Sequence, residues 1–540
     1  MEAPYSRTLF ALLDEQALRY PQRIAALHGA RSVSYAELAR RSRQVAAGLS
    51  ARGVRRGESV AILANNQIEW LEACFGASTV GAVVTPFSTW STSVELTFLL
   101  VDSRAVFLIA IDRFGSQNFS ETLRQLVPEL AITPAGAPLR SAQFPHLRGI
   151  VMIGDKVAPG MVKYDEFTQI EPLSAPPPPG EGASAVDDGI ILYTSGSSSR
   201  PKAVRMSHYA IIENGFNIGE RQGLTPEDRV FVSVPLFWAY GAVNALPATL
   251  THGATLVLQA KFDASEALEL IEKHKCTSIY TLPAMTSALI RHPLFTRERT
   301  RSLRAGLTIG SPHDVLSAAQ TLGAHEICNI YGASETYGNC CVTPHTWPLE
   351  ERAISQGYPL PGVALRIVDE KTGAVLPAGE PGLVEVKGYV MPGYGGSSAE
   401  ENAKAFTTDG HFRTGDTGRV MADGRFAFVG RTTEIIKRSG INVSPAEVEE
   451  ILLKHPKIAQ AGVTGTSDLD KGEIIVAFVV PLAGTVVTPE ELEEHCKALA
   501  SRYKVPDRIM ILEALPVTVT GKLMRRKLRE QAAILNSKKG

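Results

Sequence analysis

Apolar runs of strand length alternate with helix-like segments along the first half of this 540-residue chain. The continuous apolar run at residues 59–63 is typical of a buried strand, and residues 68–79 after it form a candidate helix. A helix at residues 94–100 and a strand at residues 106–111 repeat the pair. This alternation predicts largely parallel sheets with flanking helices.

Capping and turn residues mark several element ends. Ser34 and Glu37 form a capping-box pattern, and the helix that follows them is expected to end near Gly53. The segment PLSAPPPPGEG at residues 172–182 is a polyproline-type connector. Beyond it the alternation resumes, with predicted strands at 231–234, 254–258 and 277–281 and a helix at 265–274.

The end of the chain changes character. Ser444 is a candidate helix cap with Pro445 at the first position and Glu447 as its box partner, and residues 488–491 repeat the arrangement. Strands are expected at residues 473–480 and 508–512. We therefore predict an α/β fold with a large N-terminal domain, residues 1–431, of mixed or parallel sheets flanked by helices. A small α+β C-terminal lid domain, residues 432–540, completes it.

Composition and charge give no signal for a macromolecular partner. The net charge is −1 and the pI is near 6.9, which makes no electrostatic case for nucleic acid or an anionic membrane. The six cysteines lack CxxC spacing and are expected to be reduced thiols. Neither a signal peptide nor a run of about 18 apolar residues is recognisable. These features predict a cytoplasmic enzyme without a transmembrane segment.

A hydroxyl-rich segment, YTSGSSSRPKAV at residues 193–204, follows an apolar run. A strand that leads into such a loop presents backbone N–H groups and hydroxyls to an anion, and Lys202 adds a positive charge. This is the chemistry of a polyphosphate cradle. The spacing differs from the Walker pattern because Gly196 stands alone and no Ser or Thr follows Lys202. Taken alone, the loop is equally compatible with a Ser-rich surface turn.

The segment resembles the phosphate loop of the adenylate-forming superfamily, whose usual form is TSGTTGxPKG. Five further family segments follow in the family's order: YGASET (331–336), GYPLPG (357–362), FRTGD (412–416), GRTTEIIKRSGINVSPAEVE (430–449) and VTVTGKLMRRKL (517–528). The chain thus resembles acyl-CoA synthetases, peptide-synthetase adenylation domains and luciferases. The resemblance implies that a carboxylate attacks the α-phosphorus of ATP, with Mg²⁺ screening the phosphates, to give an acyl adenylate and pyrophosphate.

The resemblance also implies a role for each motif residue. Phosphate-loop residues and Lys202 would hold the β- and γ-phosphates, Ser334 would contact the α-phosphate, and Glu335 would bind Mg²⁺. Lys522 would bridge the substrate carboxylate and the α-phosphate, which makes Lys522, Ser334 and Glu335 the catalytic set. The full nucleotide site would comprise Thr194, Ser195, Gly196, Ser197, Ser198, Lys202, Asn329, Tyr331, Gly332, Ser334, Asp416, Arg431, Lys437, Asn442 and Lys522.

The base and the ribose would be held by residues from the middle motifs. Tyr331 would stack on adenine, and Asp416 and Arg431 would contact the ribose. Taken singly, Asp416 is compatible with an ordinary turn residue. Likewise, the basic run 525–529 beside Lys522 is compatible with a solvated helix face.

Three positions depart from the family pattern. Ser199 replaces the second glycine of the phosphate loop, and Ala203 follows Lys202 where glycine is common. If position 199 needs a positive φ, serine would cost about 1 kcal/mol. Trp238 stands where many relatives carry histidine, and it should reshape the acyl pocket unless it is a buried core aromatic.

The expected acyl pocket carries no charged side chain. It draws on Phe237, Trp238, Tyr240, Gly241, Gly310, Ser311 and Pro312. This favours an uncharged hydrophobic acid. The FDAS segment (262–265) follows GATLVL (253–258), an order that matches acyl-CoA synthetases and not amino-acid adenylation domains. We therefore expect a carboxylic acid:CoA ligase.

Two other functions remain open: an acyl-AMP ligase that loads a carrier protein, and a nucleotide-binding protein with impaired catalysis. The expected partners of the ligase are a small carboxylic acid, ATP and coenzyme A, and a homodimer is one open arrangement. Adenylation and thioester formation need different access to the same buried point. The C-terminal domain should therefore be mobile, and the resemblance implies a hinge near Thr433.

Overall fold

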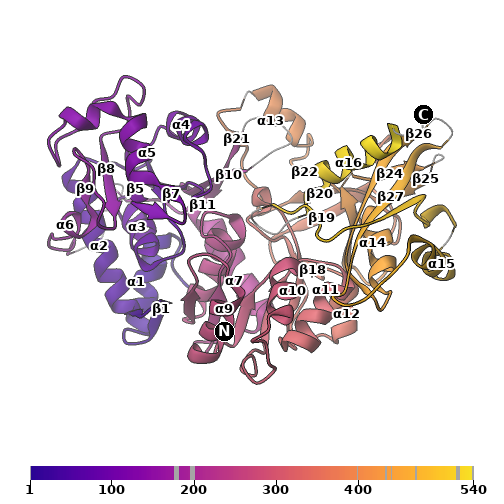
Figure 1. Ribbon diagram of the computed structural model, residues 1–540. Helices are drawn as coiled ribbons and strands as arrows, with labels where there is room; N and C mark the ends of the chain where they lie inside the picture. Colours follow the sequence, from indigo (N-terminus) through magenta and orange to yellow (C-terminus); the bar gives the residue numbers. More distant parts are fainter. Residues whose placement is uncertain are drawn as a thin grey trace.

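The computed structural model describes residues 2–174, 182–194, 201–397, 399–431, 434–438, 441–468, 471–500, 502–518 and 523–537. It shows an α/β fold with a large N-terminal domain and a C-terminal domain, on the left and right of Figure 1. The connector at residues 172–182 lies mostly outside the described residues.

Two large sheets form the frame of the N-terminal domain, and most of their strand pairs are parallel, as the alternation predicts. The first has the order β21-β11-β10-β4-β3-β5-β8-β9. Its strands are β3 (Ser59–Leu63), β4 (Val83–Pro86), β5 (Phe107–Ile111), β8 (Gly149–Ile153), β9 (Val162–Lys163), β10 (Asp188–Thr194), β11 (Lys202–Ser207) and β21 (Tyr394–Gly395).

The second large sheet has the order β18-β17-β16-β15-β14-β12-β13-β1-β2. Its strands are β1 (Ile24–His28), β2 (Arg31–Ser34), β12 (Arg229–Val232), β13 (Thr255–Leu258), β14 (Ser278–Tyr280), β15 (Ala305–Thr308), β16 (Cys328–Tyr331), β17 (Cys341–Val342) and β18 (Tyr358–Pro359).

A layer of helices packs between the two sheets, and further helices cover their outer faces. The inner helices are α1 (Leu9–Arg19), α2 (Tyr35–Ala51), α3 (Ile68–Thr79), α7 (His208–Gln222) and α8 (Leu246–Thr251). The outer ones are α4 (Ser93–Asp102) and α5 (Phe119–Leu126) on the first sheet, and α9 (Ala264–His274), α10 (Pro283–Arg291) and α11 (Pro312–Leu316) on the second.

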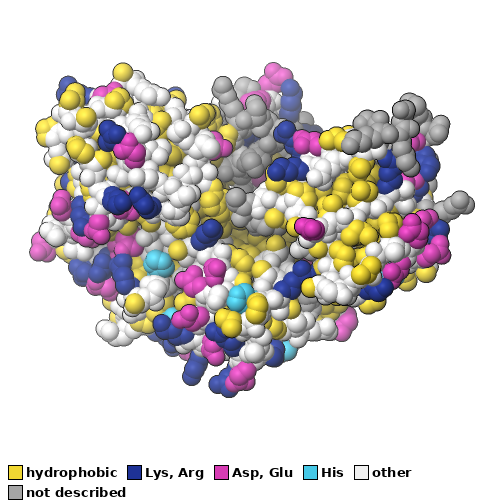
Figure 2. Space-filling view, in the orientation of Figure 1, with side chains coloured by type: hydrophobic (Ala, Val, Ile, Leu, Met, Phe, Trp, Pro, Cys, Tyr) yellow, Lys and Arg dark blue, Asp and Glu magenta, His cyan; other side chains and the backbone are white. Residues whose placement is uncertain are grey.

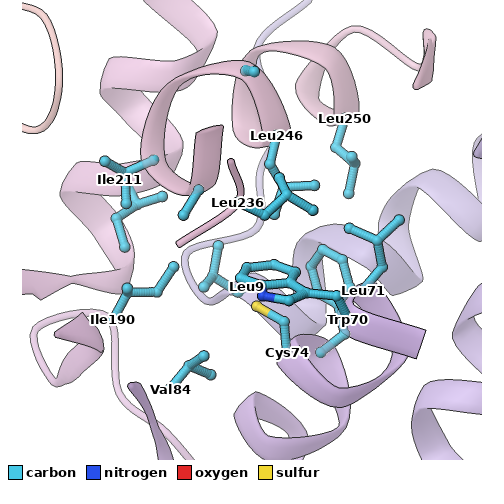
Figure 3. Close-up of a cluster of buried hydrophobic side chains, with 14 of the residues drawn as sticks. Leu9, Trp70, Leu71, Cys74, Val84, Ile190, Ile211, Leu236, Leu246 and Leu250 are labelled. Atoms are coloured by element: carbon cyan, nitrogen blue, oxygen red, sulfur yellow. The ribbon is translucent and has the colours of Figure 1, made fainter. Parts of the chain in front are cut away.

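The period-2 geometry of a strand explains why both faces of each sheet are apolar. In β3, Val60 and Ile62 join the central cluster, whereas Ala61 and Leu63 join the cluster under α4 and α5. Figure 3 shows the central cluster, where Trp70 of α3 lies among side chains from the first large sheet, such as Val84 and Ile190, and from helix α8. The cluster therefore locks the two sheets to each other.

Two smaller sheets follow. The first is antiparallel and contains β19 (Ala364–Val368), β20 (Gly382–Lys387), β22 (Phe412–Val420) and β23 (Phe426–Arg431). The C-terminal sheet contains β24 (Ile436–Arg438), β25 (Ile441–Val443), β26 (Ile458–Asp468), β27 (Gly472–Pro481) and β28 (Arg508–Ile511). Helices α14 (Pro445–Leu453), α15 (Pro489–Leu499) and α16 (Arg525–Ser537) pack on it.

One cap prediction is wrong. Ser444 is the N-cap residue of α14, but its side chain makes no capping bond. Its hydroxyl donates instead to the carbonyl of Val429 at 2.5 Å, because β23 lies beside this helix end and supplies an acceptor. In contrast, the Ser34 and Thr488 side chains do accept the N–H of the third helical residue, as predicted.

The basic run 525–529 is not wholly exposed to solvent, as the sequence alone would allow. Arg525 makes ion pairs with Glu434 at 3.0 Å and Glu449 at 2.6 Å, and Leu528 is fully buried. Arg526 remains exposed. Helix α16 is therefore amphipathic, and it covers the C-terminal sheet with Leu528 and Ala532.

Basic and acidic side chains are interspersed on the face shown in Figure 2. Within the described parts of the chain, no helix has the length and the apolar character that crossing a membrane requires. All six cysteines are free and buried.

His208, at the start of α7, gives the N-terminal domain a pH dependence. It is fully buried, and its Nδ1 accepts the N–H of Leu9 at 3.4 Å. Burial lowers the pKa of His208 to about 4, whereas the unfolded chain binds the proton near pH 6.5. Because the unfolded state then binds more protons, this stabilising contribution is complete above pH 6.5. It should fall by up to about 1.4 kcal/mol per pH unit as the pH drops toward 4.

Urea unfolding at neutral pH and near pH 5 checks this expectation with wild type and His208→Asn. The variant should be less stable at neutral pH, yet lose less stability on acidification, since the other histidines are common to both proteins. Equal acid losses in the two proteins would show that His208 does not carry the effect.

Candidate functional site

Four of the predicted site segments follow the carboxyl ends of parallel strands in the two large sheets. The phosphate loop follows β10, the segment with Phe237 and Trp238 follows β12, Gly310 follows β15, and the YGASET segment begins at the end of β16. Ligands of open α/β sheets bind outside these strand ends. The fold therefore brings together motifs that are far apart in the sequence.

Tyr331, Asp416 and Arg431 form one connected group. The Tyr331 hydroxyl donates to Asp416 Oδ2 at 2.8 Å, and Arg431 Nε lies 3.2 Å from Asp416 Oδ1. Asp416 and Arg431 are cross-strand partners of β22 and β23, which explains their closeness. Burial, together with the charge of Asp416, raises the pKa of Tyr331, so its hydroxyl remains a donor. The residues predicted to contact adenine and ribose are thus joined by direct contacts.

Aromatic packing fixes the Tyr331 ring. Its centroid lies 4.6 Å from that of Phe426 and 5.7 Å from that of Phe428, the latter nearly parallel. Gly332 follows, where a Cβ would come within 2.4 Å of the Gly338 carbonyl, so no larger residue fits. Asn329 is fully buried, and its Nδ2 has no partner among the described residues. It lies in the strand below Tyr331 rather than on the surface of the site.

A second connected group joins the phosphate loop to the predicted Mg²⁺ ligand. Thr194 and Lys202, at the two ends of that loop, are partners of β10 and β11. The Lys202 ammonium lies 4.7 Å from the ring centroid of Tyr394, and the Tyr394 hydroxyl donates to Glu335 Oε1 at 2.9 Å. A predicted phosphate contact and a predicted metal ligand are therefore linked through one tyrosine.

The YGASET segment ends in a sharp turn. Ser334 and Glu335 lie in a 3₁₀ turn, Ser334–Thr336, and Tyr337 after it has a φ of 56°, in the left-handed region. The Tyr337 hydroxyl accepts the N–H of Ser207 at 2.9 Å, and its carbonyl accepts Asn214 Nδ2 at 3.1 Å. These two contacts hold the turn that places Ser334 and Glu335 at the strand end.

Several predicted residues cannot be placed. Ser195, Gly196, Ser197, Ser198, Ser199, Thr433 and Lys522 lie outside the described residues. The backbones of Lys437 and Asn442 are cross-strand partners in the hairpin β24–β25, and their side chains are also outside the description. The roles of all these residues stay predictions.

Ala203, where the family often has glycine, lies in a regular strand. It pairs with Tyr193 of β10 and with Gly395 of β21. A Cβ on Gly395 would come within 3.2 Å of the Ala203 methyl group, so the glycine across the sheet makes room for that methyl group. Ala203 therefore needs no unusual backbone conformation.

An aromatic cluster lines the predicted acyl pocket. Trp90, in the loop after β4, makes edge-to-face contacts with Phe237 at 5.0 Å and Trp238 at 5.2 Å between centroids. Trp90 and Trp238 are only half-buried, which sets them apart from core aromatics such as Trp70. Edge-to-face pairs with this separation are a favoured arrangement of aromatic rings.

The backbone of this segment is held by Asn66, which follows β3. Asn66 Oδ1 accepts the N–H of Leu236 at 2.8 Å, and Asn66 Nδ2 donates to the carbonyl of Val234 at 3.0 Å. Close packing adds a second constraint, because a Cβ on Gly241 would come within 2.2 Å of the Pro235 carbonyl. Gly241 also begins a π-helical turn, Gly241–Ala245, a feature frequent at functional sites.

The remaining pocket residues begin α11. Ser311 caps this helix with Asp314, Pro312 is its first residue, and a Cβ on Gly310 would come within 2.6 Å of the Asp314 side chain. Tyr240 is buried, and its ring lies 5.2 Å from that of Tyr280.

The FDAS segment has a structural role. The Asp263 carboxylate caps α9 by accepting the N–H of Glu266 at 2.9 Å. The carboxylate thus satisfies the N-terminus of α9.

Sequence reasoning missed Trp90, Asn66 and Tyr394. Each acts through contacts with segments distant in the chain, and none belongs to a motif that the resemblance rested on. A signal was present only for Tyr394, in the MPGYGG turn segment at residues 391–396, where an aromatic residue stands beside glycines.

Comparison with known proteins identifies the family of the chain. Residues 13–395 match the model of the AMP-binding enzyme family, and residues 447–522 match that of the AMP-binding enzyme C-terminal domain. YngI of Bacillus subtilis (strain 168), named as a candidate acyl-CoA synthetase, is 32% identical over 97% of both chains. The mitochondrial medium-chain acyl-CoA ligase ACSF2 of Mus musculus is 31% identical over 97% of this chain and 87% of its own.

Among solved structures, ATP-bound MatB from Rhodopseudomonas palustris superposes with a TM-score of 0.84 at 25% identity, covering 97% of this chain and 98% of MatB. The fold and the similarity over nearly the whole chain agree. The chain belongs to the AMP-binding enzyme family of the adenylate-forming superfamily, and it is an AMP-forming acid–thiol ligase of the acyl-CoA synthetase type.

Proposed function

We propose that the protein activates a hydrophobic carboxylic acid with Mg²⁺ and ATP and then transfers the acyl group to coenzyme A. The observation that carries the proposal is the pair of connected groups, Tyr331–Asp416–Arg431 and Lys202–Tyr394–Glu335. The YGASET segment joins them, because it contributes Tyr331 to the first and Glu335 to the second. The first suits a nucleoside, and the second suits its phosphates.

The donor set at Glu335 fits Mg²⁺ bound together with ATP. Glu335 is half-buried, and its Oε1 accepts the hydrogen bond from the Tyr394 hydroxyl. Those residues contain no cluster of three or more metal-ligating side chains. A single carboxylate that binds the ion along with phosphate oxygens and waters is the usual protein contribution to a Mg²⁺–nucleotide site. The bound ion would neutralise charge on the departing pyrophosphate.

The reaction then needs two displacements. A carboxylate oxygen of the acid attacks the α-phosphorus, pyrophosphate leaves, and Lys522 supplies positive charge to the phosphorus as negative charge builds up. The sulfur of coenzyme A next attacks the acyl carbon, and AMP leaves. The chain's own residues hold and orient the substrates in both steps.

A mobile C-terminal domain, residues 432–540 with a hinge near Thr433, would give the thiol its access in the second step. Two buried clusters made of residues from Ile436 onward support a separate core for this domain. We also assign the protein to the cytoplasm, a proposal supported by its six free, buried thiols.

The aromatic cluster supports an uncharged, hydrophobic acid as substrate. Phe237, Trp238 and Trp90 offer apolar surface, and the neighbouring Asp314 is tied to Ser311 by two hydrogen bonds of 2.8 Å. The named medium-chain activity of the mouse relative points the same way. Trp238 occupies space that a longer acid would need.

Replacing Trp238 with alanine should therefore shift the preference toward longer acids. A pocket discriminates a single methylene by about 10–200-fold, so we expect kcat/KM for a longer acid, relative to the best wild-type acid, to rise about 10-fold or more. Pyrophosphate release with a series of straight-chain acids measures this shift.

Trp347→Ala is the matched control, because Trp347 packs on Tyr358 in a separate aromatic pair. It should leave the order of acids unchanged. The pocket assignment is wrong if Trp238→Ala lowers activity equally for every acid, or if Trp347→Ala shifts the order as much.

A further inference from the structure

Tyr394 occupies the space between the cation and the anion of the proposed Mg²⁺–ATP site. Its ring faces the Lys202 ammonium at 4.7 Å, and its hydroxyl donates to Glu335 Oε1 at 2.9 Å. Lys202 and Glu335 come from β11 and from the turn after β16, in different sheets. One side chain therefore contacts both charged groups, the ammonium through its ring face and the carboxylate through its hydroxyl.

Neighbouring segments fix the Tyr394 backbone. Val204 and Tyr394 are antiparallel partners of β11 and the edge strand β21, and Figure 1 shows β21 next to α13 (Ala399–Ala405). The Tyr394 N–H donates to Asn402 Oδ1 at 2.8 Å, and Asn402 Nδ2 donates back to the Tyr394 carbonyl at 3.2 Å. The two hydrogen bonds to Asn402 therefore fix the backbone from which the Tyr394 ring extends.

The same turn also holds the Glu335 backbone. The N–H of Met391 donates to the Glu335 carbonyl at 2.8 Å. Glu335 is consequently fixed at its main chain by Met391 and at its carboxylate by Tyr394.

The chemistry of the site makes such a spacer useful. A free lysine ammonium and a nearby carboxylate attract each other, and a direct ion pair would occupy the groups that phosphate and Mg²⁺ need. An aromatic face attracts the ammonium without neutralising it, and a phenol hydrogen bond orients the carboxylate while leaving it anionic. Partners that orient a metal ligand in this way strongly affect metal affinity.

We propose that Tyr394 is a positioning residue that keeps Lys202 and Glu335 apart and aims them at the phosphates and at Mg²⁺. This inference rests on the proposed function, because it needs ATP and Mg²⁺ at these two side chains. The Tyr394 hydroxyl orients Glu335, and the Tyr394 ring positions Lys202. The two contacts can therefore be tested separately.

Calorimetric titration of ATP, in the presence of Mg²⁺ and in the presence of EDTA, separates the two parts without measuring turnover. Tyr394→Phe keeps the ring and loses the hydroxyl. It should weaken ATP binding about 10–100-fold with Mg²⁺, the range found when the partner of a metal ligand is removed. In EDTA it should bind ATP as wild type does. Tyr394→Leu removes both groups and should weaken binding in EDTA as well.

Tyr389→Phe is the matched control. Tyr389 lies in the same segment, and its hydroxyl lies 3.3 Å from that of Tyr209, so its loss should change neither titration. If Tyr394→Leu does not fold, as thermal melting would show, Tyr394→Phe still tests the role of the hydroxyl.

Three results would overturn the inference. Tyr394→Phe could bind ATP like wild type with Mg²⁺, it could lose equal affinity in Mg²⁺ and EDTA, or folded Tyr394→Leu could match Tyr394→Phe in EDTA. Failure of the proposed function looks different, because wild type itself would then bind ATP no better with Mg²⁺ than in EDTA.

Discussion

Lys522→Ala is expected to lower the rate of adenylation by about 10²–10³-fold, the usual cost of removing one preorganised donor from a transition state. ATP binding should persist, since the positive charge is needed mainly when the α-phosphorus gains its fifth ligand. Thioester formation from supplied acyl adenylate should also persist. Single-turnover release of pyrophosphate, and CoA-dependent consumption of synthetic adenylate, measure the two steps.

Lys527→Ala provides the control for a lost basic residue, because Lys527 is an exposed neighbour in the same basic run. It should adenylate at the wild-type rate. The role assigned to Lys522 is refuted if Lys522→Ala releases pyrophosphate at a near-normal rate, or if both half-reactions slow by the same factor.

Asp416→Ala is expected to raise the KM for ATP by about 10²-fold or more. A buried carboxylate that accepts the ribose hydroxyls contributes hydrogen bonds to a charged group, each of about 1.5–3 kcal/mol, and about 1.4 kcal/mol is a factor of ten. Asp416 is 5% exposed and is already held by Tyr331 and Arg431, so little reorganisation precedes binding. Initial rates of pyrophosphate release at varied ATP give the KM.

Tyr331→Phe separates the direct role of Asp416 from an indirect one. It removes the donor to Asp416 Oδ2 but keeps the ring against Phe426 and Phe428. We expect a much smaller rise in KM than for Asp416→Ala. If Tyr331→Phe reproduces the whole effect, Asp416 acts by holding the tyrosine rather than by binding ribose.

The sequence predicts those elements whose signals are local. The bounds of β3 and α3 coincide with the predicted ranges, because a short apolar run and a longer mixed segment differ in period and length. The strand β26 was not predicted. Its sequence, IAQAGVTGTSD, has little alternation, and its structure depends on the long ladder with β27. For helix α16, only the basic run at residues 525–529 was considered from the sequence. The buried apolar face of this helix, which Leu528 and Ala532 form, was missed.

The site residues also divide into those with a local sequence signal and those that depend on contacts with distant segments. Tyr331, Glu335, Asp416 and Arg431 could be assigned because each stands inside an ordered motif, and the structure places them in connected groups. Tyr394 could not be assigned, because its role depends on partners contributed by β11 and by the turn after β16. Only the folded chain brings these segments together.

The same reason applies to Trp90 and Asn66. Trp90 follows a strand of the first large sheet, whereas its partners Phe237 and Trp238 follow a strand of the second. Asn66 holds the backbone of the latter segment from the loop after β3. Motif order along a chain contains no information about such contacts. The shape of the acyl pocket is therefore less predictable from sequence than the nucleotide site.

Isotope exchange between pyrophosphate and ATP is the most direct measurement of the central claim, that the protein forms an acyl adenylate. The enzyme is incubated with ATP, Mg²⁺, a hydrophobic acid and labelled pyrophosphate, without coenzyme A. Because adenylate formation is reversible, we predict that label enters ATP only when the acid is present, and that added coenzyme A diverts the adenylate to AMP and thioester. Release of ADP and phosphate without exchange, or exchange that does not depend on any acid, would contradict the account.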